Sequence, residues 1–122
     1  MQQLNFRGKI LVITRKGYGA RMISKYRPPL PIIAMTPSKT TARELNLIWG
    51  VQSIHIENID FFNLDAESLI EQSVKYGVEA KVLDENEHVI ILLVSRKFQL
   101  RGNLVGLYYV GEILEPKPHE EQ

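Results

Sequence analysis

The stretch Lys9-Ile-Leu-Val-Ile-Thr14-Arg-Lys-Gly-Tyr-Gly19 places a continuous apolar run directly before a loop with two bases and two glycines. A short apolar run that ends in polar residues is typical of a strand buried on both faces, as in a parallel sheet. A helix is expected next, over residues 20–26, because Pro28 and Pro29 cannot continue it. The stretch therefore predicts a strand, a glycine-containing turn and a helix in succession.

Strands and helices alternate along most of the chain. Four further apolar or alternating runs predict strands over residues 31–36, 51–56, 89–94 and 104–114. Strands that alternate with helices imply right-handed crossovers and a mostly parallel sheet covered on both faces. No helix separates the last two strands, so the last one is expected to be antiparallel. The predicted fold class is α/β.

The helix ends follow from capping residues and glycines. Ser38 is the expected N-cap of a helix that ends at Trp49, whose ring is expected in the core. The next helix is expected to begin at Asn63 or Asp65 and to end at Gly77.

Length and composition restrict the class of protein. With 122 residues, the chain is expected to form one domain over residues 1–114 and a flexible tail over residues 115–122. The absence of cysteine excludes disulfides, thiolate metal sites and a cysteine nucleophile. No apolar run reaches the about 20 residues that span a bilayer, and the N-terminus is too polar for a signal peptide. We therefore expect a cytoplasmic protein without a membrane segment.

The net charge of +1 conceals a strong asymmetry. Residues 1–43 hold nine lysines and arginines and no acid, whereas residues 44–122 carry a net charge of −8. A basic segment of this kind attracts anions, either phosphorylated metabolites or nucleic acid. The alternative is that basic and acidic elements pair across the fold.

The candidate binding site is the loop after the first strand. Ligands of α/β sheets bind at the carboxyl ends of the strands, and a glycine-rich turn lets backbone N–H groups approach an oxyanion. The following helix N-terminus adds partial positive charge. The candidate phosphate-binding residues of this loop are Thr14, Arg15, Lys16, Gly17, Tyr18, Gly19 and Ala20. The alternative is a tight turn with solvated bases, since the loop is neither a Walker A motif nor a dinucleotide fingerprint.

A second basic cluster, Arg96, Lys97 and Arg101, directly follows the fourth strand. If that strand lies beside the first, the two basic loops face each other across a cleft that suits a sugar bisphosphate or a nucleotide. Ordinary surface charge is the alternative.

Other reactive side chains indicate no metal site and no cofactor. His55, His88 and His119 lie far apart without ligand spacing, and the acidic turn at residues 84–87 is expected to be a solvated loop. Ser95 is the one candidate nucleophile, but no base accompanies it.

Three stretches resemble the C-terminal domain of pyruvate kinase: Thr14-Arg-Lys-Gly-Tyr-Gly-Ala-Arg-Met-Ile-Ser-Lys-Tyr-Arg-Pro-Pro29, Pro31-Ile-Ile-Ala-Met-Thr36 and Thr41-Ala-Arg-Glu-Leu-Asn-Leu-Ile-Trp-Gly-Val51. The family shows Thr-x-Ser-Gly-x-Thr/Ser-Ala and Ile-Ser-Lys-x-Arg-Pro in the first stretch. It shows Pro-Ile-x-Ala-x-Thr in the second and Arg-x-Leu-x-Leu-x-x-Gly-Val in the third. The match is dense over residues 9–51 and weaker beyond.

The resemblance implies a three-layer α/β/α domain with a mixed five-stranded sheet in the order 3-2-1-4-5 and an antiparallel last strand. In pyruvate kinases, which act in glycolysis, this domain is regulatory, binds phosphorylated effectors and takes part in tetramer contacts. Catalysis belongs to a separate barrel domain, which this chain does not contain. The chain is therefore expected to be an excised piece or a free-standing relative, with a pyruvate kinase barrel as an implied partner.

The effector motif of the family is matched at Thr14, Gly17 and Ala20. Lys16 stands where the family has Ser, and Gly19 stands where it has Thr or Ser, so two phosphate-binding hydroxyls are lost. Either the charge of Lys16 and the accessible N–H of Gly19 compensate for the lost hydroxyls, or the site is inactive. Only Gly102-Asn103 resembles the family's later effector loop.

The expected function is thus allosteric regulation through a phosphorylated effector, with no catalysis by this chain. One alternative is a small phosphatase or phosphotransferase that uses Ser95, and another is nucleic-acid binding by the basic third, where the aromatic residues are few. A third is an oligomerisation module with a degenerate ligand site. The very apolar edge strand at residues 104–114 predicts a homodimer at least.

Overall fold

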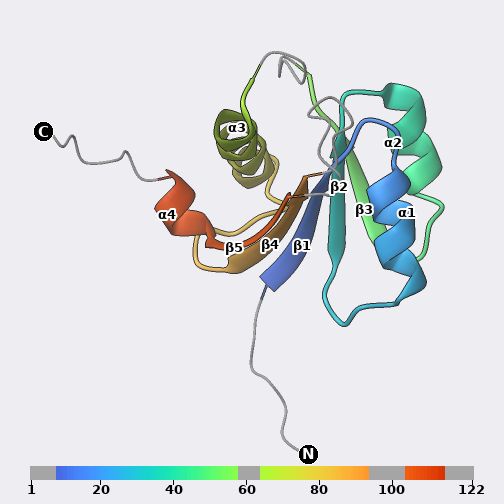
Figure 1. Ribbon diagram of the computed structural model, residues 1–122, viewed down its shortest axis with the longest axis horizontal. Helices are drawn as coiled ribbons and strands as arrows, with labels where there is room; N and C mark the ends of the chain where they lie inside the picture. Colours follow the sequence, from blue (N-terminus) through green and yellow to red (C-terminus); the bar gives the residue numbers. More distant parts are fainter. Residues whose placement is uncertain (1–7, 58–63, 94–103, 115–122) are drawn as a thin grey trace, which may run out of the picture.

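A computed structural model describes residues 8–57, 64–93 and 104–114, which form a five-stranded sheet with helices on both faces (Figure 1). The expected α/β class and the sheet order β3-β2-β1-β4-β5 are confirmed. The elements are β1 (Gly8–Ile13), α1 (Tyr18–Lys25), β2 (Ile32–Thr36), α2 (Lys39–Leu45), β3 (Val51–His55), α3 (Ala66–Glu79), β4 (His88–Leu93), β5 (Leu104–Tyr109) and α4 (Val110–Leu114).

Strand β1 lies at the centre of the sheet. It pairs in parallel with β2 on one side, where Ile10 is opposite Ile32, and with β4 on the other, where Ile10 is opposite Ile90. Residues Leu11 and Val12 are fully buried, one on each face. The continuous apolar run of β1 is therefore required by burial on both faces. Strand β5 pairs antiparallel with β4, as expected.

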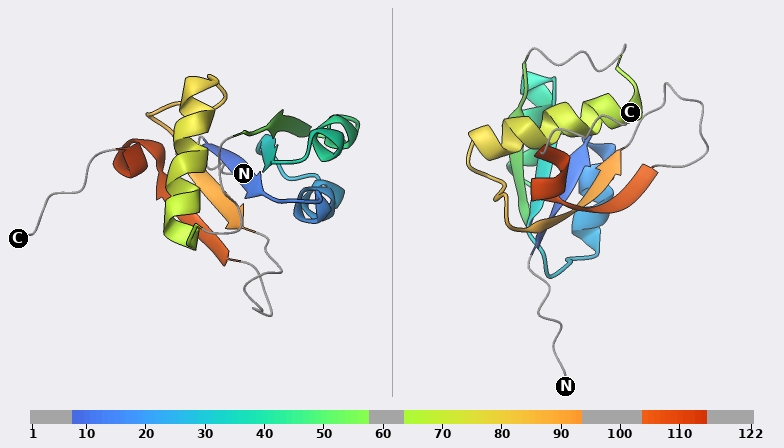
Figure 2. Two further views of the ribbon diagram at one scale, coloured as in Figure 1. Left: turned by 90° about the horizontal axis from the view of Figure 1, so that it is seen from above. Right: turned by 90° about the vertical axis from the view of Figure 1, so that its left-hand side faces the viewer.

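Two apolar cores lie on the two faces of the sheet. Helices α3 and α4 cover one face, and α1 and α2 cover the other (Figures 1 and 2). Alternate residues of β1, β2, β3 and β4 contribute to the two cores, as the pleat of a strand requires. The α1–α2 layer covers β1, β2 and β3, so the same face of β5 carries two exposed apolar side chains, Val105 and Leu107.

Side chains cap two helices as the sequence predicts. The Thr41 N–H donates to Ser38 Oγ at 3.1 Å before α2, and the Ser68 N–H donates to Asp65 Oδ1 at 2.8 Å before α3. The backbone N–H and the hydroxyl of Ser68 stabilise the Asp65 carboxylate, so the pKa of Asp65 lies below its ordinary value. Asp65 is thus the cap of α3, whereas Asn63 lies outside the described residues.

The last strand is shorter than predicted. Residues 104–109 form β5, but residues 110–114 form α4 instead of extending the strand. Val110 is fully buried, and Ile113 and Leu114 pack against the core beneath α3. The Val110 N–H donates to the Glu87 carbonyl oxygen at 3.0 Å. Contact with α3 therefore overrides an apolar pattern that also fits a strand.

Two expectations about helix ends were wrong. Helix α3 continues to Glu79, so Gly77 lies inside it, where it faces Leu83 and Met35. Helix α2 ends at Leu45 instead of Trp49, and Trp49 is 49% exposed and not in the core. After α2 the hydrogen bonds span three residues, because the Ile48 N–H donates to the Leu45 carbonyl. This tighter turn brings Ile48 against the core and leaves Trp49 at the surface.

Candidate functional site

The predicted loop lies between β1 and α1, at the carboxyl end of the central strand (Figure 1). Strand β1 has β2 on one side and β4 on the other. The order in which successive strands join the sheet therefore reverses at β1. Ligands of open α/β sheets bind outside the carboxyl ends of the strands at such a reversal. The loop therefore occupies the position that the fold class favours for a ligand.

Thr14 determines the shape of the loop. Its side chain is almost fully buried, and its N–H donates to the Met35 carbonyl at 2.9 Å, which continues the pairing with β2. Its Oγ1 accepts a hydrogen bond from the Gly17 N–H at 3.0 Å. The hydroxyl thus closes the turn between β1 and α1, and its own hydrogen stays available for one further acceptor.

Gly17 is required at its position for two reasons. Its φ of +86° lies in the left-handed region, which favours glycine. A Cβ there would lie 3.0 Å from Leu45 Cδ2 and 3.2 Å from Thr41 Cγ2. The loop therefore packs directly on α2, a contact that the spacing of the loop residues alone does not reveal.

Thr36 at the end of β2 is a site residue that sequence reasoning missed. Its Oγ1 donates to the Arg15 carbonyl at 3.1 Å and accepts from the Ser38 N–H at 3.2 Å. The side chain thereby joins the β1–α1 loop to the turn before α2. The signal that could have found it is a threonine directly after an apolar strand, the same place that Thr14 has after β1.

The N-terminus of α1 has no side-chain cap and no acidic residue in its first turn. Its first backbone N–H groups are donors without partners inside the helix, and the helix dipole adds partial positive charge. Gly19 and Ala20 are buried, so their backbones lie close against neighbouring atoms. Arg15, Lys16 and Tyr18 are exposed around this end. Such an arrangement can bind a phosphate or another oxyanion.

Of the two predicted basic clusters, only the one after β1 lies within the described residues. Residues 14–17 form the turn after β1, and residues 18–20 are the first turn of α1, which begins two residues earlier than expected. The second cluster, Arg96, Lys97 and Arg101, lies outside the described residues, as does Ser95. The neighbouring strands that it depends on are present, because Ile13 at the end of β1 pairs with Leu93 at the end of β4.

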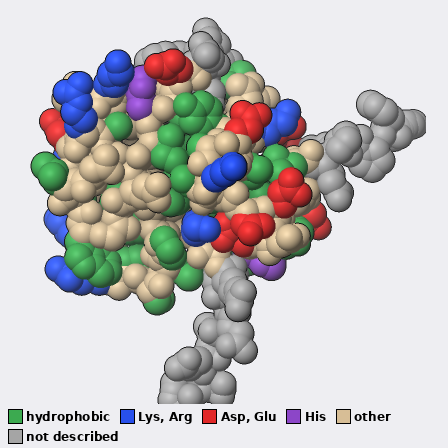
Figure 3. Space-filling view, turned by 180° about the vertical axis from the view of Figure 1, so that it is seen from behind, with side chains coloured by type: hydrophobic (Ala, Val, Ile, Leu, Met, Phe, Trp, Pro, Cys, Tyr) green, Lys and Arg blue, Asp and Glu red, His purple; other side chains and the backbone are tan. Residues whose placement is uncertain are grey.

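The charge asymmetry of the sequence becomes a surface asymmetry. Lysines and arginines prevail at the left margin of Figure 3, on the side of α1 and α2, and most acidic side chains lie on the right, on the side of α3 and α4. Among the described residues, Lys9 and Glu87 pair across the fold at 2.7 Å. Arg21 and Glu44 pair on the α1–α2 side at 3.3 Å. In the described part of the chain, both pairs join a basic residue of the first 43 to an acidic residue of the rest.

Residues 8–57, 64–93 and 104–114 contain no group of three or more His, Asp or Glu side chains that could hold a metal ion. His55 Nε2 lies 3.1 Å from the Pro37 carbonyl oxygen, which ties β3 to the turn before α2. None of the described helices is long and apolar enough to cross a bilayer.

Comparison with known proteins identifies the family. The family model described as "Pyruvate kinase, alpha/beta domain" matches residues 3–102. The chain belongs to this family. The resemblance to the C-terminal domain of pyruvate kinase is thereby confirmed, and the family explains the three-layer fold.

Several pyruvate kinases match most of this chain. The relative from Sporosarcina psychrophila is 40% identical over 107 residues, which are 86% of this chain and 17% of the relative. A relative from Agrobacterium vitis is 34% identical over 83 residues, which are 68% of this chain and 17% of the relative. A crystal structure of a pyruvate kinase from Cryptosporidium parvum aligns with a TM-score of 0.65 and 28% identity over 87% of this chain and 19% of that one. The chain thus spans about a sixth of the pyruvate kinases it matches.

Proposed function

We propose that this pyruvate kinase alpha/beta domain is a regulatory domain that binds a phosphorylated metabolite at residues 14–20, which are the turn after β1 and the first turn of α1. The observation that carries the proposal is the uncapped N-terminus of α1, which begins at a left-handed glycine beside two exposed bases. Backbone N–H groups and the helix dipole supply a site for one phosphate, and Arg15 and Lys16 supply the charge.

The roles of the individual residues follow from their contacts. Lys16 is exposed in the turn between β1 and α1. Its ammonium group can donate a hydrogen bond to a phosphate at the position where the family motif has a hydroxyl. Gly19 has no side chain and is buried, so we assign it the close packing of this turn and no contact with the ligand. The Thr14 hydroxyl already accepts from Gly17, and we assign it the orientation of the loop together with one donated hydrogen bond.

Helix α1 runs from this turn to the surface around Trp49. Near its C-terminus, Ser24 Oγ donates to the Trp49 carbonyl at 2.6 Å, and the Arg27 guanidinium lies 4.7 Å from the centre of the Trp49 ring. Tyr26 and Leu47 are more than 80% exposed beside this contact. We propose that this apolar surface contacts a pyruvate kinase barrel, because exposed aromatic and aliphatic groups in one area are typical of interfaces.

The test is calorimetric titration of the full chain with fructose 1,6-bisphosphate, ribose 5-phosphate, glucose 6-phosphate and AMP, at low and moderate salt. We expect saturable micromolar binding of one of them. Lys16→Ala is expected to weaken it by about tenfold or more, because a charge-assisted hydrogen bond contributes about 1.5–3 kcal/mol.

Lys25→Ala is the matched control, because Lys25 is an exposed lysine in the last turn of the same helix. Its removal is expected to leave the affinity within about twofold. Equal losses in the two variants, together with a steep salt dependence, would indicate diffuse attraction of a polyanion such as nucleic acid. The absence of binding by all four ligands contradicts the proposed site.

We further propose that two copies of the chain pair through β5. This strand lies at the edge of the sheet, and its side chains Val105 and Leu107 are 65% and 62% exposed. An exposed apolar edge strand presents unpaired backbone groups and apolar area to a second copy.

Leu107→Arg is expected to weaken the dimer by at least about tenfold, because a charge would be buried without a partner at the pairing edge. Sedimentation equilibrium measures the effect. Leu47→Arg is the control, since Leu47 is equally apolar and 86% exposed but lies after α2. A wild-type chain that stays monomeric at about 100 µM would contradict pairing through β5.

A further inference from the structure

The outer surface of helices α1 and α2, which lie side by side on one face of the sheet, is strongly basic (Figure 2). Residues 14–45 hold seven lysines and arginines and one acid, Glu44. Six of these bases are exposed, and the seventh, Arg21, pairs with Glu44 at 3.3 Å. The exposed bases are Arg15, Lys16, Lys25, Arg27, Lys39 and Arg43. The proposed phosphate site uses only the first two, which leaves four exposed cations of this layer unexplained.

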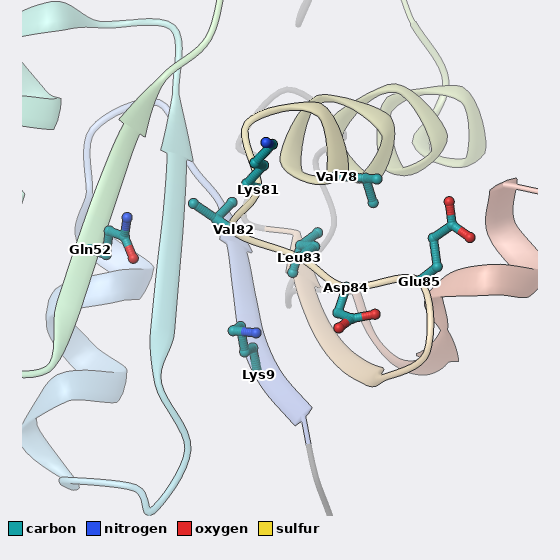
Figure 4. A pocket seen from close by; sticks show the side chains of 8 residues that line it. All are labelled: Lys9, Gln52, Val78, Lys81, Val82, Leu83, Asp84 and Glu85. Carbon is teal, nitrogen blue, oxygen red and sulfur yellow. The ribbon is translucent and has the colours of Figure 1, made fainter.

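The opposite layer of the domain has the reverse charge. The described residues 64–93 and 104–114 hold eight acids and two lysines. A pocket of about 530 Å³ beside α3 has a balanced lining, whose charged residues are Lys9, Lys81, Asp84 and Glu85 (Figure 4). The charge distribution of the domain therefore attracts a polyanion to α1 and α2 and not to α3 and α4 (Figure 3).

Three exposed aromatic rings lie among the bases of α1 and α2. Tyr18 at the start of α1 and Tyr26 after its end are both more than two-thirds exposed. Their positions lie about 12 Å apart along the helix axis. Trp49 joins them, because the turn after α2 leaves its ring at the surface, where the Arg27 guanidinium lies 4.7 Å from the ring centre. The basic layer thus presents aromatic rings at both ends of α1.

Two of the bases occupy positions that do not favour the helices themselves. Lys16 lies just before α1 and Lys39 is the first residue of α2, and neither helix has an acid in its first turn. The positive end of the helix dipole disfavours a cation at both positions. Helix α3, on the acidic side, has the usual arrangement, with Glu67 in its first turn. An anion that binds outside α1 and α2 would explain why two neighbouring helices carry cations at their positive ends.

We propose that the outer surface of α1 and α2 binds a single-stranded nucleic acid. The phosphates of the strand would lie along the exposed bases of the layer, and unpaired nucleobases would stack on Tyr18 and Tyr26. Basic side chains that follow the backbone, together with aromatic rings that stack on the nucleobases, are how proteins hold single strands without reading their sequence. A duplex offers no unpaired nucleobase to these rings. An anionic bilayer would need a contiguous apolar face, whereas here Lys25 and Arg21 lie between the two tyrosines.

This inference goes beyond the proposed regulatory function. A strand that reaches Tyr26 and Trp49 would occupy the surface that we assign to a pyruvate kinase barrel. The two partners would therefore exclude each other there, and the experiments use the chain without a barrel.

The first experiment is a fluorescence-anisotropy titration of a labelled oligothymidylate of about 20 nucleotides with the full chain, in about 50 mM salt. The same strand paired with oligodeoxyadenylate is titrated beside it. We expect saturable binding of the single strand with a Kd below about 100 µM, and binding of the duplex at least about tenfold weaker. No binding of the single strand by about 200 µM chain, or equal binding of the duplex, would overturn the proposal. A chain that binds phosphatidylserine vesicles but not the strand would assign the surface to a membrane instead.

A pair of tyrosine variants tests the stacking. Tyr26→Ala is expected to weaken binding of the single strand by at least about fivefold, because stacking on one ring contributes about 1–3 kcal/mol. Tyr26→Phe keeps the ring and is expected to bind like the wild type. The side chain is 81% exposed, so neither change disturbs the core. Equal affinities of the two variants would contradict stacking on this ring.

A pair of lysine variants tests the contact with the phosphates. Lys39→Ala is expected to reduce the slope of log affinity against log salt concentration by about 0.7, the change for one lost phosphate contact with a single strand. Its melting temperature is expected to equal or exceed that of the wild type, since the helix dipole no longer opposes a cation there. Lys75→Ala, on the exposed side of α3, is the control and is expected to leave the slope unchanged. The same slope in both variants would overturn the assigned surface. Because Lys39 lies outside residues 14–20, this titration and the metabolite titration can fail independently.

Discussion

Replacing Gly17 by valine is expected to lower the free energy of unfolding by about 2–4 kcal/mol and to abolish binding of the phosphorylated ligand. The backbone contributes one part of the loss, because a β-branched residue is strained at a φ of +86°. Packing contributes the other, because the new Cβ would lie 3.0 Å from Leu45 Cδ2 and 3.2 Å from Thr41 Cγ2. Urea unfolding measures the stability, and the calorimetric titration described above measures the affinity.

Gly50→Val is the matched control for this variant. Gly50 also has a positive φ, +73°, but no atom lies within 4 Å of the position of its Cβ. Valine at this position is expected to lower the free energy of unfolding by about 1–2 kcal/mol, through backbone strain alone. The ligand affinity is expected to stay unchanged. Equal losses of stability in the two variants would show that the contact between the loop and α2 contributes nothing.

Replacing Gly77 by valine is expected to destabilise the domain by about 2–3 kcal/mol. A Cβ at this position in α3 would lie 2.6 Å from Leu83 Cδ1 and 3.1 Å from Met35 Cε. Both neighbours are buried, so they cannot move without disturbing the core. Valine has a better helix propensity than glycine, which stabilises the folded state by about 0.5 kcal/mol. This gain is smaller than the cost of overpacking. Urea unfolding provides the measurement.

Gln72→Val is the control for Gly77, since it places the same side chain on the exposed side of the same helix. It is expected to change the free energy of unfolding by no more than about 0.5 kcal/mol. A Gly77→Val variant as stable as Gln72→Val would show that Leu83 and Met35 adapt without cost.

Local sequence signals predicted most of the architecture. The apolar run of β1 indicated a strand buried on both faces, and the alternation of strands and helices led to the parallel crossovers and an antiparallel last strand. Ser38 was recognisable as a cap, and the next cap was narrowed to Asn63 or Asp65, because a cap acts on N–H groups two or three residues away. The position of the loop Thr14–Ala20 followed from the same reasoning, since it directly continues the central strand.

The errors arose where distant contacts override local preference. Residues 110–114 are apolar enough for a strand, yet Val110 is fully buried in the core that α3 also contributes to, and the segment becomes α4. Gly77 resembles a helix terminator, but it is where Leu83 and Met35 approach α3. Trp49 has the spacing of a core residue, but the turn after α2 tightens and leaves it exposed.

Patterns within a few consecutive residues therefore specify the α/β class and the candidate phosphate site after β1. The strand order was expected from the resemblance of three sequence stretches to a known family, not from any local pattern. The hydrogen bond from Thr36 to Arg15, the packing of Gly17 on Leu45 and the pocket that Gln52 and Lys81 both line (Figure 4) could be found only in the folded domain. These groups are 21 to 29 residues apart in the chain. They meet only after the sheet has formed, so no local pattern of residues encodes their contact.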